Sequence, residues 1–396
     1  MNILAMIVTP QRLDYAHFKG MAREPATRDS IADLRDSGSD AVEIALRAIA
    51  DRCGLADRES ELDMIAIRAA FGGTVFDGPV MVTDEVLRTV QELAAGSPLH
   101  AAALLDLLAA CRRVFADKPI VLVFETSFFV KLPPQERCYA LGRAVAPNGG
   151  PRRFGYHGIF HETACRYAAK TLCERGDGSP PRMLSICLEP RPEVAAVLGG
   201  TPYMVTSGAT PMDGLPSHTA CGELDPSIIL FIADKWKWGA EQINAVLTTE
   251  SGILGMTGRP ATLAELFTSS AADLQPAREM IQYRMLRACG AGAAALGGVD
   301  ALVFSGRYAA AGQALGPALA GRLEKALRGA ISREIPWGCL AEPLDRIVAD
   351  AAAAKLLDSR VSRDGPDINR PRGGRVGDWH GIGAASGKNA RCLGTG

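Results

Sequence analysis

The sequence predicts a two-domain α/β protein in which helices cover mixed or parallel β-sheets. Short apolar runs of strand length alternate with longer segments of helical periodicity, an order typical of α/β folds. Several of the short runs are almost wholly apolar, as expected for strands that are buried on both faces. The chain has 396 residues, more than one hydrophobic core usually serves, so two domains of ordinary size are expected.

The strands and helices follow from length and apolar spacing. The predicted strands are NILAMIV, MIAIRAAF, PIVLVF, MLSICL, YMVT and DALVF. Helices are expected over 83–95, 98–116, 162–176, 225–238, 275–296 and 311–329. The fourth helix opens on Asp225 and Pro226, a capping residue followed by one favoured in the first turn.

A joint rich in proline and glycine, APNGGPRR at 146–153, divides the chain. We therefore expect an N-terminal domain over 1–149 and a C-terminal domain over 150–341, with a helix near 342–358 free to return to the first. The segment 359–396 is rich in glycine and arginine and lacks aliphatic periodicity, so it is expected to be a flexible tail. We assign the tail no function.

The composition argues against several classes of protein. Hydrophobic residues make up 47% of the chain and charged residues 22%, a composition that does not favour disorder. The formal net charge of −1 does not favour electrostatic binding of nucleic acid. The ten cysteines include no CxxC pair and no Cys/His cluster at zinc spacing, so reduced thiols are expected. No basic leader and no run of about 18 apolar residues is present, so we expect a cytoplasmic protein without a membrane partner.

Motifs along the chain point to a family. They are RAAFGGTVF, VTDEVLRTVQELAAGSPLH, VFETSF, RRFGYHGIFH, SGATPMDGL, CGELDPSII, ESGILGMTG and GAGAAALGGVDALVFSG. In order and approximate spacing they resemble the motifs of acetate kinase and its acetokinase relatives, up to about residue 358. The resemblance implies a two-domain, actin-like and sugar-kinase-like (ribonuclease-H-like) fold with a central cleft. It also implies a homodimer that transfers a phosphoryl group from ATP, with Mg²⁺, to a short-chain carboxylate such as acetate.

The resemblance assigns chemistry to retained residues. Arg68 matches a transition-state arginine, whose guanidinium can clamp oxyanions, and His157 matches a histidine that donates a hydrogen bond to the transferred phosphoryl group. Glu125 replaces an aspartate with a longer carboxylate, which could still order water on the metal. His100 matches a second family histidine, and His161 matches one that is mainly structural. An ordinary strand-end arginine and core histidines are the alternative interpretations.

A pocket for the carboxylic acid is also implied. Ala70, Leu99, Tyr156 and Pro211 match positions that hold the methyl group of acetate in the family. Tyr156 adds a hydroxyl where the family has phenylalanine, and Ala70 is smaller than the family's valine. The resemblance therefore implies an acid larger or more polar than acetate, with simple core packing as the alternative.

The family's first phosphate loop is replaced. Ile7, Pro10, Arg12 and Asp14 stand where the family has an asparagine, two serines and a lysine. Proline removes a backbone donor, and aspartate reverses a charge that should meet phosphate.

Other phosphate and metal positions have changed too. In CLEPR, Glu189 and Arg191 replace glycines that let the backbone approach phosphate. Ala220 falls on a second transition-state arginine, and Leu344 on a glutamate linked to the metal. Only Gly306 persists in the loop that faces the nucleotide. The sequence therefore predicts an acetate-kinase-like phosphotransferase of impaired activity; the alternative is an inactive acetokinase homologue that acts as a ligand-binding or protein-interaction module.

Overall fold

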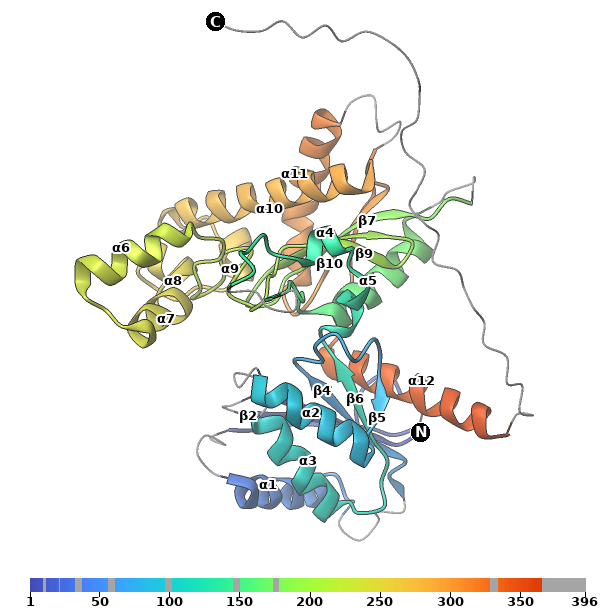
Figure 1. Cartoon of the computed structure of the whole chain (residues 1–396). Helices are drawn as coiled ribbons and strands as arrows, with labels where there is room; N and C mark the ends of the chain where they lie inside the picture. The colour runs from blue at the N-terminus through green and yellow to red at the C-terminus, as the bar shows by residue number, and fades with distance from the viewer. Residues whose placement is uncertain are drawn as a thin grey trace, which may run out of the picture.

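The computed structural model describes residues 1–9, 12–20, 22–32, 38–55, 61–96, 102–144, 150–173, 178–327 and 334–364. Within these residues the chain forms two mixed β-sheets, each with its own covering helices (Figure 1). The predicted α/β class is confirmed, and each predicted strand is present. The sheets also contain strands that lack a long apolar run, such as β2 (Arg12–Phe18) and β3 (Thr27–Ala32), which are held by pairing with their neighbours.

The first sheet has the strand order β3-β2-β1-β4-β6-β5. Its other strands are β1 (Ile3–Val8), β4 (Met64–Ala69), β5 (Val80–Met81) and β6 (Ile120–Phe124). Strands β1, β4 and β6 are parallel, in a register that pairs Arg68 with both Ile7 and Val123. The carboxyl ends of these strands therefore meet at one edge of the sheet, where open α/β folds usually bind ligands.

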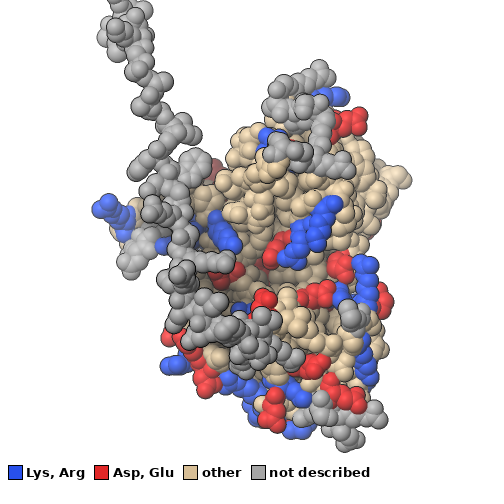
Figure 2. All heavy atoms as spheres, turned by 90° about the vertical axis from the view of Figure 1, so that its right-hand side faces the viewer, with Lys and Arg blue, Asp and Glu red and all other residues tan. Residues whose placement is uncertain are grey.

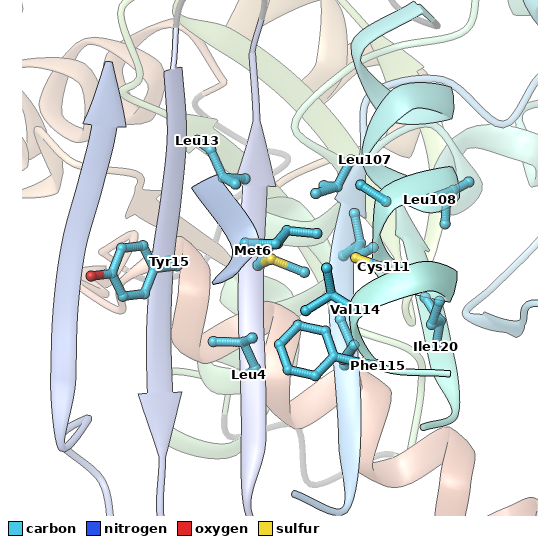
Figure 3. Packing of buried hydrophobic residues seen from close by; sticks show 14 of the residues in the cluster. Leu4, Met6, Leu13, Tyr15, Leu107, Leu108, Cys111, Val114, Phe115 and Ile120 are labelled. Carbon is cyan, nitrogen blue, oxygen red and sulfur yellow. The ribbon is translucent and has the colours of Figure 1, made fainter. Parts of the chain in front are cut away.

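Helices cover both faces of the first sheet. On one face α1 (Gly38–Arg52), α2 (Asp84–Gly96) and α3 (Ala102–Val114) bury the main core. Figure 3 shows side chains of β1 and β2 in this core beside those of α3, with Met6 near Leu107 and Cys111. On the other face α12 (Leu344–Asp364) packs Val348 and Ala352 against strand residues.

The second sheet has the order β11-β10-β7-β8-β9. Its strands are β7 (Arg182–Cys187), β8 (Glu193–Leu198), β9 (Thr201–Val205), β10 (Ala301–Ser305) and β11 (Trp337–Cys339). Helix α5 (Gly158–Thr171) packs on one face, and α10 (Gln275–Leu296) and α11 (Gly312–Ala326) pack on the other. The smaller helices are α4 (Pro134–Arg137), α6 (Pro226–Trp236), α7 (Ala240–Thr249), α8 (Gly252–Thr257) and α9 (Leu263–Thr268). Among the described residues, no helix combines the length and apolar character of a membrane span.

The helix boundaries correct the sequence prediction in two places. Helix α5 begins at Gly158, not at 162. His157 occupies its N-cap position without a side-chain capping bond, and the Gly158 N–H donates instead to the Glu125 carbonyl over 2.9 Å. Helix α12 continues to Asp364, past the predicted start of the tail, and 365–396 lie outside the described residues. The predicted cap of α6 is confirmed, since Asp225 accepts a hydrogen bond from the Ser227 N–H over 2.8 Å.

The buried His17 of β2 gives a pH-dependent prediction. Its side chain is enclosed, and neither ring nitrogen has a hydrogen-bond partner in the described part of the chain. Burial, with Lys19 nearby, lowers the pKa of His17. As the pH falls through about 6.5, His17 therefore binds a proton more readily in the unfolded chain than in the folded protein. This difference makes the folded state less stable at acidic pH.

We expect the free energy of unfolding to fall between about pH 7 and pH 5, and His17→Leu to reduce that slope. Urea unfolding of both proteins at several pH values measures the difference. Identical pH dependence in the two proteins would contradict the assignment.

Candidate active site

Arg68 and Glu125 form an ion pair at the carboxyl edge of the first sheet. Arg68 lies near the end of β4, Glu125 follows the neighbouring strand β6, and Arg68 Nε donates to Glu125 Oε1 over 2.9 Å. The Glu125 side chain is 1% exposed and that of Arg68 is 19% exposed. The parallel pairing of β4 and β6 thus brings together two residues that the sequence singled out.

Both members of this pair retain unused hydrogen-bonding groups. Among the described residues, only Nε of the Arg68 guanidinium has a protein partner, which leaves its two terminal nitrogens free to donate to an oxyanion. Glu125 Oε2 is buried and has no partner in the part of the chain that the structure describes. A buried carboxyl oxygen left alone is costly, so this atom is suited to a bound water or cation.

His157 immediately precedes Gly158, whose backbone N–H binds the Glu125 carbonyl. His157 itself adopts a left-handed backbone conformation, with φ of 55°, which is uncommon for a residue other than glycine. The next residue, Gly158, is bonded to the Glu125 carbonyl, and a side chain at Gly158 would collide with that oxygen. The structure therefore brings the backbone next to His157 into contact with the backbone of Glu125, whose side chain is paired with Arg68.

The ring of His157 is already engaged. Its Nε2 lies 3.1 Å from the backbone carbonyl oxygen of Arg191. Because a carbonyl only accepts, Nε2 carries the proton and donates it to Arg191. In the neutral ring the remaining nitrogen, Nδ1, is an acceptor.

Contacts link the chain segments that carry three of the residues predicted for the acid pocket, Ala70, Tyr156 and Pro211. Tyr156 is buried and its hydroxyl donates to the Ala209 carbonyl over 3.0 Å, two residues before Pro211. Phe71, next to Ala70, meets Phe154 edge to face with ring centroids 4.8 Å apart. Burial raises the pKa of the Tyr156 phenol, so this hydroxyl stays protonated at neutral pH. The two other predicted residues, Leu99 and His100, lie outside the described residues.

His161 lies one helical turn beyond His157 and is completely buried. Its Nδ1 is 2.8 Å from the Ser185 hydroxyl, and its Nε2 is 3.1 Å from Glu193 Oε1. The residue that sequence reasoning missed here is Glu193. Its sequence context gives no signal, because only the pairing of β7 with β8 brings it beneath α5.

An open pocket of about 530 Å³ lies between the two sheets at the predicted phosphate position. Its lining includes Ile7, Arg12 and Asp14 from β1 and β2, together with Glu189, Arg307 and Leu344. Pro10, also predicted here, lies outside the described residues. The lining has three arginines against five carboxylates, so it carries no surplus of positive charge for a polyphosphate.

The arginines of this pocket are paired with carboxylates. Arg12 Nη2 lies 2.8 Å from Asp14, and Arg28 Nε lies 2.7 Å from Asp345. Glu189 accepts the backbone N–H of Arg307 over 2.7 Å and its Nε over 2.9 Å. Glu189 is buried, so a carboxylate of the protein itself accepts the hydrogen bonds that the backbone N–H and Nε of Arg307 can donate.

The remaining predicted positions are structural in this conformation. Gly306 has a φ of 88°, and a side chain there would lie 2.9 Å from the Leu188 carbonyl oxygen. Ala220 is buried, and its N–H donates to the Ser217 hydroxyl. His218, two residues before Ala220, accepts the Leu263 N–H over 3.2 Å, and burial together with Arg307 lowers the pKa of His218. No permanent cation therefore stands at Ala220.

Charged residues of both signs are interspersed over the face in Figure 2. Helices α5 and α12 border a second hollow of about 1020 Å³, and its lining includes Arg166, Lys170 and Asp350. In the described part of the chain, no group of His, Cys, Asp and Glu has the arrangement of a metal site.

The sequence model of the acetokinase family matches residues 15–313. Among curated proteins, the chain is 30% identical to the acetate kinase of Thermoanaerobacterium thermosaccharolyticum over 289 residues, 69% of each chain. It is 36% identical to the acetate kinase of Syntrophobacter fumaroxidans over 242 residues, 60% of this chain but only 58% of that relative.

Solved structures show the same fold. The acetate kinase of Porphyromonas gingivalis has a TM-score of 0.77 at 23% identity, with 90% of this chain and 99% of that one covered. A propionate kinase from Francisella tularensis has a TM-score of 0.73 at 20% identity, with coverage of 88% and 98%.

Proposed function

Because the chain belongs to the acetokinase family, we propose that it is an ATP:carboxylate phosphotransferase whose carboxylate site is retained and whose phosphoryl transfer is impaired. The observation that carries this proposal is the position of Glu189. Its buried carboxylate takes the backbone and side-chain donors of Arg307 inside the loop where the family approaches phosphate. Incoming phosphate oxygens would have to displace that carboxylate or remain beside it.

The retained part of the site supports carboxylate binding. The terminal nitrogens of Arg68 can donate to both oxygens of a carboxylate, and Glu125 holds the guanidinium in place. Tyr156, Ala70 and Pro211 would enclose the acyl group, as acetate, propionate or butyrate. The acid site would therefore survive the changes elsewhere.

The changed part supports weak transfer. Phosphoryl transfer depends on cations and donors placed around the phosphoryl oxygens. Loss of one arginine costs about 10³–10⁵ in rate, and loss of one donor about 10²–10³. Here Ala220 supplies no guanidinium, Asp14 neutralises Arg12, and the His157 Nε2 proton is held by Arg191.

The metal requirement is met only in part. Mg²⁺ is typically held by one or two carboxylates together with waters and substrate phosphates. Glu125 Oε2 supplies one buried oxygen that has no partner among the described residues, so Glu125 would hold the ion only with ATP phosphates as further ligands. When bound, Mg²⁺ would neutralise charge on the transferred group.

A coupled assay with Mg-ATP and acetate, propionate or butyrate tests the proposal. We expect slow turnover that exceeds that of an Arg68→Ala variant. Turnover equal to that variant, with carboxylate binding retained, would instead support the alternative of an inactive homologue that binds ligands or proteins. Micromolar Mg-ATP affinity in calorimetry would contradict the impaired phosphate site.

We also propose a homodimer that forms through α6. None of the α6 residues is buried, and Leu230 and Phe231 are 71% and 56% exposed. An apolar helix face of this kind is typical of an interface. Phe231→Asp is expected to convert the dimer to a monomer in sedimentation experiments, while Val75→Asp, at another exposed apolar residue, leaves it a dimer. A wild-type monomer would refute this proposal.

The domain division and location are proposed as well. We place the boundary near residue 149 and assign α12 to the first domain, since α12 packs on the first sheet. The cysteines that the structure describes are free thiols, which supports a reducing, cytoplasmic location.

A further inference from the structure

The buried Glu193 at the start of β8 links two segments of the candidate site. Its Oε2 accepts the backbone N–H of Tyr156 over 3.0 Å, and its Oε1 lies 3.1 Å from His161 Nε2. Glu193 and His161 are both fully enclosed. Both carboxyl oxygens are therefore used, and both contacts reach the segment that carries His157.

That segment needs an external constraint. Gly155 and His157, on either side of Tyr156, have positive φ values of 66° and 55°. A non-glycine residue in this conformation persists only where its surroundings hold it. The N–H between these two residues is the one that Glu193 binds, and a side chain at Gly155 would collide with the ring of Phe129.

The second contact fixes the start of α5. With Nε2 protonated, His161 donates to Glu193 and accepts the Ser185 hydroxyl proton at Nδ1. Glu193 thus holds the turn before His157 and the first turn of the helix after it. Neither contact places Glu193 against a substrate.

We propose that Glu193 is a positioning residue that sets the backbone of Tyr156 and, through it, the orientation of the His157 ring. The functional consequence rests on the proposed carboxylate site. The positioning role itself does not depend on that proposed site, because it concerns only contacts within the chain. Glutamine at this position has one carbonyl oxygen and so satisfies only one of the two N–H donors, whereas aspartate keeps both acceptors on a shorter stem.

The test combines ring NMR with ligand binding. Long-range ¹H–¹⁵N spectra of the histidine rings report tautomers, and His157→Asn assigns the His157 signals. The wild type is expected to show His157 with its proton on Nε2, as its contact with Arg191 requires. Glu193→Gln is expected to shift these signals towards a mixture of tautomers and to weaken propionate binding about tenfold or more. Glu193→Asp keeps both acceptors but on a shorter stem, so it is expected to change both properties measurably, though less than Glu193→Gln.

Asp300→Asn is the matched control. Asp300 is another buried acid, and it is paired with Arg182 over 2.9 Å. This pair lies where β7 and β10 begin, at the end of these strands that is remote from Cys187 and Ser305. The Asp300→Asn variant should have a lower Tm, while its His157 signals and its propionate affinity stay as in the wild type. Glu193 would be purely structural if Glu193→Gln lowered Tm in the same way but left the His157 signals and the propionate affinity unchanged. If Glu193→Gln does not fold, the same conclusion would follow from a Glu193→Asp variant that left both quantities unchanged. A wild type that binds no carboxylate would count against the proposed function, while the His157 spectra would still decide the role of Glu193.

Discussion

Replacing Arg68 by alanine is expected to weaken propionate binding by about 2–5 kcal/mol, roughly thirtyfold or more, and to destabilise the fold as well. The binding loss follows because the terminal nitrogens of Arg68 are the available donors at the strand edge. The stability loss follows because Glu125, 1% exposed, would keep a buried carboxylate with no cation beside it. Removing one partner of such a buried pair costs about 3–5 kcal/mol.

A double variant separates the two effects. In Arg68→Ala with Glu125→Gln, the buried charge is gone, so much of the stability should return while propionate binding remains weak. Calorimetric titration and urea unfolding of the single and double variants measure both quantities. Arg68 would have no binding role if the double variant recovered propionate affinity together with stability.

Replacing Glu189 by glycine is expected to strengthen Mg-ATP binding about ten- to a hundredfold. The change removes a negative charge from the pocket and releases the backbone N–H and guanidinium of Arg307 as donors. At about 4 Å, a charge of this kind contributes roughly 1–4 kcal/mol in surroundings between water and a protein surface. Turnover should rise less than affinity, because Asp14 and Ala220 are unchanged.

Two controls show which property of Glu189 matters. Glu189→Gln keeps the shape but removes the charge, so a gain in Mg-ATP affinity with both variants would identify charge as the cause. Arg307→Ala removes the guanidinium but keeps the backbone N–H of residue 307 as a donor to Glu189, so it leaves the carboxylate less neutralised and is expected to weaken Mg-ATP binding below that of the wild type. Unchanged nucleotide affinity in Glu189→Gly would show that this carboxylate does not block the phosphate site.

Much of the fold could be predicted from periodicity. Strands such as β6, buried along its whole length, and helices such as α10 and α11 have clear apolar patterns. By contrast, β2 and β3 carry charged residues, and they are strands because they pair with β1 and with each other. Pairing with a distant segment leaves little trace in local composition, so these strands were missed.

The residues of the candidate site also fall into two groups, those that the sequence identifies and those that only the structure reveals. Arg68, Glu125 and His157 were identified because each lies in a recognisable motif at the end of a strand or the start of a helix. Glu189 was identified only as a replaced glycine, and its bond to Arg307 was not foreseen. Glu193 was not identified at all, since nothing in its own segment distinguishes it from an exposed glutamate.

By itself, the sequence determined the α/β class, the family resemblance and the residues that are retained or replaced at each motif. These are properties of local pattern and of order along the chain. Only the tertiary structure decided which charges meet: Arg68 with Glu125, 57 residues apart, and Arg307 with Glu189, 118 residues apart. The physical reason is that such contacts depend on strand order and register, which bring distant segments to one edge and determine whether a buried charge finds a partner there.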